Sequence, residues 1–178
     1  MKLQDKLSQI LLILVGVALF ATNGMLLYQN FQLRRALETS KQFVTEKGYK
    51  FSSLPGVSLN GISAPLVLEG QDKQTLFLVF SSKCEYCLQQ YPHWKSLLAR
   101  MDRSRWNIIG VTADSDAALI NEHLEENGLS GLPVHMIASE EMRRARLGFT
   151  PMTVAVDVTG EVIDVWAGLT STGFESLH

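Results

Sequence analysis

The stretch FSSKCEYCLQQYP, residues 80–92, contains the only two cysteines of this 178-residue chain, Cys84 and Cys87. They follow directly on an apolar run, TLFLVF (residues 75–80), which has the length and composition of a buried parallel strand. Helix-forming residues then continue as far as Met101. The pattern predicts that both cysteines lie where a buried strand turns into the first turn of a helix.

A CxxC pair in that position is suited to reversible disulfide chemistry. Cysteines at i and i+3 can bring their sulfurs within bonding distance, and the free N–H groups of a helix N-terminus stabilise a thiolate. We therefore expect Cys84 to be the exposed nucleophile and Cys87, one turn further on, to resolve the mixed disulfide. The cation of Lys83 should favour the Cys84 thiolate, whereas Glu85 should oppose it.

Metal binding stays open as an alternative use of the cysteines. A structural zinc site needs four ligands, and this chain offers two cysteines and four histidines without a second CxxC or an HxxxH pattern. A copper(I) site would combine the two thiolates with one distant imidazole, for which His135 is the candidate. The remaining histidines are His93, His123 and His178.

The N-terminal segment is the sharpest change in composition. No charged residue occurs between Leu7 and Leu33, and residues 10–28 are almost wholly apolar. A helix of this length reaches about 28 Å, close to the hydrocarbon thickness of about 30 Å. A cleavable signal peptide would be shorter and would end at a small-x-small site, which the residues around Ala21 do not provide. We predict an N-terminal tail over residues 1–9 and a transmembrane helix over 10–28.

The rest of the chain divides into a helical stalk, residues 29–47, and one domain, residues 48–178. The lysines and arginines that flank the apolar segment lie on both sides of it, so they do not choose an orientation. A tethered cysteine pair is most useful in an oxidising compartment. We therefore predict a single-pass membrane protein whose C-terminal domain lies on the extracytoplasmic, periplasmic side.

Composition and pattern indicate one α/β domain that does not bind nucleic acid. The hydrophobic content of 46% suffices for one core, and the net charge of −2 provides no basic field for nucleic acid. Strand and helix patterns alternate in the order β-α-β-α-β-α-β-β, which predicts a mixed sheet with flanking helices and a final antiparallel hairpin. The further strands are expected at residues 106–112, 133–138, 152–157 and 162–168, and the further helices from Asp114 or Ser115 to Glu126 and over residues 139–148.

Three separate motifs give the chain a family resemblance. SSKCEYC opening a helix, QQYP in its first turns and LGFTPMTVAVDVTGEVIDVWAG (residues 147–168) together resemble the thioredoxin superfamily. The chain is most similar to membrane-anchored extracytoplasmic thiol-disulfide oxidoreductases of the TlpA/ResA type, which include cytochrome c maturation and methylamine-utilisation accessory proteins. The resemblance covers residues 50–170. It implies a thioredoxin-like fold and disulfide exchange through Cys84 and Cys87 without a dissociable cofactor.

The resemblance also implies the partners and further site residues. Pro151 should be cis and lie against the cysteines, and the backbone of Thr150 should pair with an extended segment of a partner protein. Partners would be protein dithiols or disulfides, together with a membrane-embedded electron donor. The direction of exchange, as reductant, oxidant or isomerase, stays open.

The chain departs from the family pattern at three places. Lys83 replaces a tryptophan before the first cysteine. Gln90 replaces a carboxylate that assists proton transfer, and a neutral amide cannot act as a general base. Only ten residues follow Gly168, so we expect one face of the sheet to be thinly covered, or to be covered by the stalk.

Overall fold

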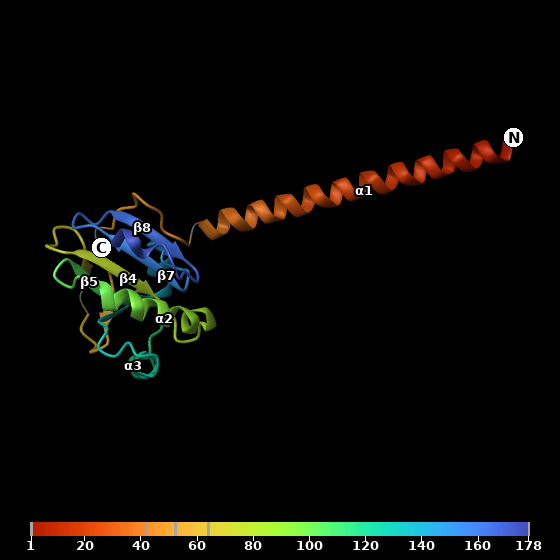
Figure 1. The fold of residues 1–178 in the computed structure, drawn as a ribbon. Helices are drawn as coiled ribbons and strands as arrows, with labels where there is room; N and C mark the ends of the chain where they lie inside the picture. Colours follow the sequence, from red (N-terminus) through yellow and green to blue (C-terminus); the bar gives the residue numbers. More distant parts are fainter. Residues whose placement is uncertain (1, 42, 52, 64, 178) are drawn as a thin grey trace. The chain divides into compact units, whose positions relative to one another are not determined.

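The computed structural model describes residues 2–41, 43–51, 53–63 and 65–177 (Figure 1). The chain divides into two compact units, Met1–Lys41 and Gln42–His178. The first unit is the single helix α1, Lys2–Lys41, coloured red to orange in Figure 1. Within the described part of the chain, none of the helices has both the length and the apolar character that crossing a membrane requires. The transmembrane helix predicted over residues 10–28 is thus not shown.

A six-stranded mixed sheet forms the centre of the second unit, in the order β2-β6-β5-β4-β7-β8. Strand β5 runs parallel to both β4 and β6, whereas β7 is antiparallel to β4 and β8, and β2 is antiparallel to β6. This confirms the predicted mixed sheet that ends in an antiparallel hairpin. The strands are β2 Val57–Ser58, β4 Gln74–Val79, β5 Trp106–Thr112, β6 Val134–Met136, β7 Met152–Val156 and β8 Val162–Ala167, and a small separate sheet pairs β1 Ser53–Leu54 with β3 Leu66–Val67.

The predicted helices are present, but two of their ends differ from the prediction. The helix predicted over residues 139–148 ends at Arg144, because Arg146 has a left-handed backbone with φ 56°. Helix α3 begins after Asp116, whose side chain accepts hydrogen bonds from the N–H groups of Ala118 and Leu119 at 3.0 and 3.1 Å. The prediction that Asp114 or Ser115 caps this helix was therefore wrong, because the Asp114 carboxylate is engaged elsewhere. The helices are α2 Glu85–Arg100, α3 Ala117–Glu126, α4 Ser139–Arg144 and the short 3₁₀ helix η1 Phe174–Leu177.

The central strand β4 is buried on both faces, which explains its uninterrupted apolar sequence. Alternate side chains of a strand point to opposite faces. Leu76 and Leu78 join a core cluster with residues of α2 and α3. Phe77 and Val79 join a second cluster with residues of β1 and α4. All four side chains have no exposed surface, so the strand that leads to the cysteines is held in place from both sides.

The short C-terminal segment covers the face on which α2 lies. Phe174 and Leu177 of η1 are buried in the same cluster as Cys87. The ring of Phe174 also packs against Trp166 of β8, with ring centroids 5.1 Å apart. The expectation of a thinly covered face was wrong for this face, because two large apolar side chains of the last residues fill it.

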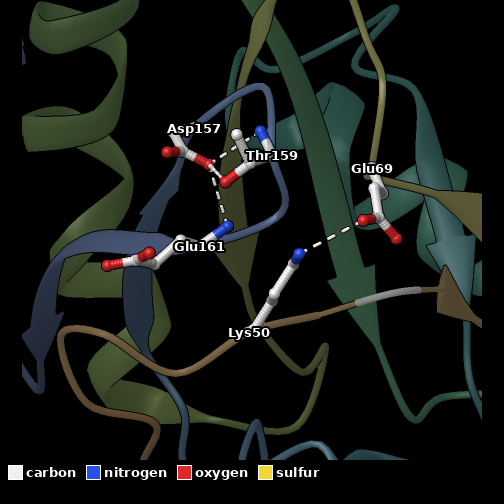
Figure 2. A network of polar contacts seen from close by, with 5 residues as sticks. All are labelled: Lys50, Glu69, Asp157, Thr159 and Glu161. Carbon is white, nitrogen blue, oxygen red and sulfur yellow. Dashed lines mark hydrogen bonds and ion pairs between the residues drawn. The ribbon is translucent and has the colours of Figure 1, made fainter.

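The β7–β8 hairpin turns through a network built on Asp157 (Figure 2). Its Oδ1 accepts hydrogen bonds from the N–H and hydroxyl of Thr159, both 2.8 Å long, and from the N–H of Glu161, 2.9 Å long. Gly160 lies between them with φ +85°, and a Cβ at this position would lie 2.2 Å from the carbonyl oxygen of Phe51. The turn therefore requires glycine.

The segment that follows α1, residues 43–51, pairs with this hairpin and with the loop before β7. The N–H of Phe51 donates to the carbonyl of Gly160 in the hairpin at 2.8 Å, and the N–H of Gly148 donates to the carbonyl of Phe43 at 3.0 Å. Lys50 also forms an ion pair with Glu69 at 3.1 Å (Figure 2). The predicted stalk over residues 29–47 is helical only as far as Lys41. The helix does not continue through residues 43–47, because the backbone of residues 43–51 forms hydrogen bonds with the hairpin and with the loop before β7.

Candidate active site around Cys84 and Cys87

Both cysteines lie at the predicted junction between strand β4 and helix α2. Cys84 is the N-cap residue of α2, with extended backbone angles (φ −98°, ψ 110°), and is partly exposed. Cys87 lies in the first turn and is completely buried. Its N–H donates to the carbonyl of Cys84 at 3.0 Å, and both side chains are free thiols. The sulfur of Cys84 is therefore accessible, while that of Cys87 is shielded.

The loop before β7 brings Thr150 and Pro151 against Cys84. The peptide bond between Thr150 and Pro151 is cis, as the family resemblance implies. The Cys84 Sγ donates to the carbonyl oxygen of Thr150 at a distance of 3.6 Å. Residues 66 positions apart in the chain thus form one site.

The two thiols have opposite pKa shifts. Partial burial raises the pKa of Cys84, but hydrogen bonds from the side chains of Thr150 and Cys87 and from the backbone N–H groups of Cys87 and Tyr86 outweigh it. The Cys84 pKa is therefore lowered. Burial raises the pKa of Cys87 to about 12, against a lowering contribution from the backbone of Ser81. The site therefore contains one thiol that ionises readily, Cys84, and one that keeps its proton, Cys87.

Asp114, at the end of β5, holds the loop that precedes Cys84. Its carboxylate accepts hydrogen bonds from the N–H of Ser82 at 2.6 Å and from the hydroxyl of Ser81 at 3.1 Å. Sequence reasoning missed this role. A signal existed, because parallel strands β4 and β5 end at the same edge of the sheet, and Asp114 follows the second strand as the cysteines follow the first.

The residues predicted to tune the thiolate lie in different environments. Lys83 and Glu85 are exposed, and neither is among the main contributions to the Cys84 pKa. Gln90 is buried, and its amide is hydrogen-bonded at both ends to the backbone of Thr170, with distances of 2.9 and 2.8 Å. Gln90 therefore anchors the C-terminal segment to α2. A tuning role of these three residues stays a prediction.

A second buried polar pair lies on the inner side of α2. The hydroxyl of Tyr91 is 2.9 Å from Nε2 of His123 in α3, and both side chains are buried. One turn further along α2, the indole N–H of Trp94 donates to the hydroxyl of Thr153 at 2.7 Å. These contacts satisfy polar groups in an otherwise apolar core.

Among the described residues, the other candidate metal ligands form no metal site with the cysteines. His135 of β6 is buried, and its Nε2 lies 3.3 Å from the carbonyl oxygen of Leu54. His93 is partly exposed on α2, and His178 lies outside the described residues. Among the residues that the structure describes, no three His, Cys, Asp or Glu side chains are grouped so that they could hold a metal ion.

A cavity of about 430 Å³ opens beside Thr150. The apolar side chains of Phe80, directly after β4, and of Met142 in α4 form part of its wall, and Asp114 and Ser81 contribute polar groups. Its lining residues are Phe80, Ser81, Ala113, Asp114, Ser139, Met142, Arg143, Leu147, Gly148 and Thr150.

The chain combines a thioredoxin-like fold with a dithiol at a strand-to-helix turn beside a cis-proline. No family model and no curated protein matches the sequence. Solved structures do match it. They include a protein from Bacteroides thetaiotaomicron assigned as a protein disulfide isomerase (TM-score 0.61, 17% identity, 75% of this chain and 86% of that one).

Two further structural neighbours are also named for thiol-disulfide exchange. One is the thioredoxin domain of a thiol-disulfide oxidoreductase from Bacteroides vulgatus (TM-score 0.56, 18% identity, 71% of this chain and 89% of that one). The other is a protein from Chlorobium tepidum assigned as a thiol:disulfide interchange protein DsbE (TM-score 0.60, 17% identity, 74% of this chain and 92% of that one). At these identities the likeness establishes the fold, so the predicted thioredoxin-like fold is confirmed. These three neighbours are named for thiol-disulfide exchange, the activity that the resemblance to the thioredoxin superfamily implies for this chain.

Proposed function

We propose that the protein is a thiol-disulfide oxidoreductase that exchanges a Cys84–Cys87 disulfide with partner proteins. The observation that carries this proposal is the asymmetry of the pair. Cys84 is accessible at the N-cap of α2 with a lowered pKa, while Cys87 is buried with a raised pKa. An accessible thiol that ionises readily suits a nucleophilic cysteine, and a shielded thiol one turn away suits the cysteine that later resolves the mixed disulfide.

In the reducing direction, the thiolate of Cys84 attacks a disulfide of the partner. A mixed disulfide forms between Cys84 and one partner sulfur, and the other partner sulfur leaves as a thiolate. Cys87, as a thiolate, then attacks Cys84 Sγ, so that the intramolecular disulfide forms and the second partner sulfur leaves. Two electrons pass to the partner, and its two thiolates take up two protons.

The partner is positioned by the loop before β7. Its chain would pair with the backbone at Thr150, next to the carbonyl that Cys84 Sγ contacts, and the cavity beside Thr150 would take a flanking side chain. Exchange through the two cysteines is complete in itself, so we propose that no dissociable cofactor takes part.

The proposal includes a membrane tether and an extracytoplasmic location. The support is the sequence, in which residues 7–33 carry no charge and residues 10–28 are almost wholly apolar. In this arrangement a membrane-embedded donor would re-reduce Cys84 and Cys87, and the protein would act as a reductant in the maturation of cytochrome c or of methylamine dehydrogenase. The resemblance to the TlpA/ResA type supports these roles.

A redox titration of the full chain tests the function. The protein is equilibrated with defined glutathione or dithiothreitol couples, and the thiols are trapped and counted by mass. A reversible two-electron transition near about −270 mV is expected for a reductant, and one nearer about −120 mV would instead indicate an oxidant. No reversible transition, or a stoichiometric metal that blocks trapping, would favour the metal-binding alternative.

The assignment of the two cysteines has its own test. The Cys87→Ser variant should accumulate mixed disulfides with partner proteins, because nothing then resolves the bond at Cys84. The Cys84→Ser variant should not accumulate them, because the remaining thiol is buried and keeps its proton. The reverse pattern would exchange the two roles.

A further inference from the structure

The resolving step needs an acceptor for the proton of Cys87, and this inference rests on the proposed function. Burial raises the pKa of Cys87 to about 12, so at neutral pH almost all of the group is a thiol, which is not the attacking species. Gln90, at the place of the family carboxylate, is an amide whose two polar atoms are already bonded to Thr170. The proton must therefore pass to water or to another side chain near the buried end of the site.

Tyr91 and His123 are placed to serve as this acceptor. Tyr91 follows Cys87 by four residues, so both side chains lie on the same face of α2. Both are buried in the same core cluster, and Nε2 of His123 lies 2.9 Å from the Tyr91 hydroxyl. Imidazole is the type of side chain that takes up and releases protons near neutral pH.

The charges around Tyr91 keep its hydroxyl protonated. Burial raises the pKa of Tyr91 far above its ordinary value, and the negative charge that Cys87, Cys84 and Asp114 carry when they are ionised raises it further. In the tautomer of His123 that carries its proton on Nδ1, the phenol donates to Nε2, and its oxygen keeps lone pairs that can accept a proton. The two cysteines act on the phenol from the start of α2, Asp114 acts from the loop after β5, and His123 contacts it from α3. The acidic side chains of α3 itself, Glu122, Glu125 and Glu126, are exposed.

We propose that Tyr91 and His123 together take up the proton of Cys87 during resolution. The thiol proton moves to the phenol oxygen, and the phenol's own proton moves to His123 Nε2. The Cys87 thiolate attacks Cys84 Sγ, the bond between Cys84 and the partner sulfur breaks, and the partner leaves as a thiolate that takes a proton from water. His123 then returns its proton to the solvent, so the step is balanced. His123 acts through Tyr91 and is in this sense a positioning residue.

The test separates the two half-reactions in the reduced full chain. With an excess of the aromatic disulfide DTNB, one coloured thiolate is released when Cys84 attacks, and a second when Cys87 displaces the reagent from Cys84. Both releases are followed over a range of pH. The Tyr91→Phe variant keeps the ring and removes only the hydroxyl. It should leave the first release unchanged, slow the second at least about tenfold at neutral pH, and move the pH midpoint of the second upward.

The His123→Gln variant distinguishes proton transfer from hydrogen bonding. Glutamine can still bond to the Tyr91 hydroxyl but cannot accept a proton at neutral pH, so the same slowing of the second release is expected. Thr153→Val is the matched control. It removes a different buried hydrogen bond to α2, that of Trp94, and should leave both releases unchanged.

The possible outcomes distinguish a failure of the proton-transfer inference from a failure of the proposed function. A second release of wild-type rate and pH profile in Tyr91→Phe overturns the inference, as does a wild-type profile in His123→Gln. Slowing by the same factor at every pH, or equal slowing in Thr153→Val, also overturns it, because a loss of packing would act in this way. If the wild-type chain gives no second release at all, the proposed function fails instead.

Discussion

Gln90 and Thr170 are joined by two hydrogen bonds that run in opposite directions. The Gln90 amide N–H donates to the Thr170 carbonyl at 2.9 Å, and the Thr170 N–H donates to the Gln90 amide oxygen at 2.8 Å. Gln90 lies on α2 one turn beyond Cys87. Its side chain thus pairs with a backbone segment 80 residues away in the sequence. A group with both a donor and an acceptor is required here, which a carboxylate is not.

Restoring the family carboxyl by Gln90→Glu should therefore make stability depend on pH. A protonated carboxyl can donate to the Thr170 carbonyl, but an ionised one faces that oxygen in a buried site, so its pKa in the folded state is raised. A group with a raised folded pKa stabilises the fold below its unfolded pKa, about 4.3, and loses this contribution as pH rises. We expect near wild-type stability at pH 4 and a loss of about 1–3 kcal/mol at pH 7.

Chemical denaturation of the two proteins at several pH values measures this difference. Gln89→Glu is the matched control, because Gln89 is the exposed neighbour and the added charge is the same. The control should show a small difference at every pH. A difference for Gln90→Glu that does not change with pH would show that the paired hydrogen bonds do not constrain this position.

Cys84 should react as a thiolate below the pH at which free cysteine does. Its hydrogen bonds outweigh partial burial and lower its pKa, whereas Cys87 stays protonated and buried. The rate of alkylation of the reduced protein by iodoacetamide should have a midpoint below the ordinary thiol value of about 8.5, with the mass label on Cys84. Thr150→Val removes one of the hydrogen bonds and should raise the midpoint. A wild-type midpoint at or above the ordinary value contradicts the geometry.

Asp114→Ala should loosen the loop before Cys84. The variant leaves the N–H of Ser82 without its acceptor at an expected cost of about 1–3 kcal/mol, and it should slow the reaction of Cys84 severalfold. Asp102→Ala is a matched control, since Asp102 accepts hydrogen bonds from both the N–H and the hydroxyl of Ser104 in an exposed turn. Equal effects of the two changes on Cys84 reactivity would show that Asp114 has no special role at the site.

His135 should make the fold less stable in acid. Burial lowers its pKa in the folded state, against a smaller raising effect of the hydrogen bond with Leu54. Protonation then favours the unfolded chain, so stability should fall as pH falls below the unfolded histidine value of about 6.5. The comparison is between wild type and His135→Gln, unfolded by denaturant at pH 8 and at pH 5. Wild type should lose more stability than the variant, and His93→Gln, at a partly exposed site, should behave as wild type.

Much of the fold could be predicted because its signals are local. The apolar run before Cys84 predicted a strand buried on both faces, and the structure buries Leu76, Phe77, Leu78 and Val79 completely. The alternation of strand and helix patterns predicted the mixed sheet, because crossover connections leave few topologies. The helix start at Asp116 was misplaced by one or two residues, because three neighbouring side chains could each have served as the cap.

The sequence by itself determined the reactive pair, its place at the start of a helix and the Thr150–Pro151 loop that the resemblance placed beside it. Only the tertiary structure decided what surrounds them: Asp114 on Ser82, Gln90 on Thr170 and Tyr91 on His123, pairs separated by 32, 80 and 32 positions. The physical reason is the range of the interactions. A helix cap or a strand period acts between near neighbours in the chain, whereas a buried polar side chain finds its partner only when separate elements have packed together.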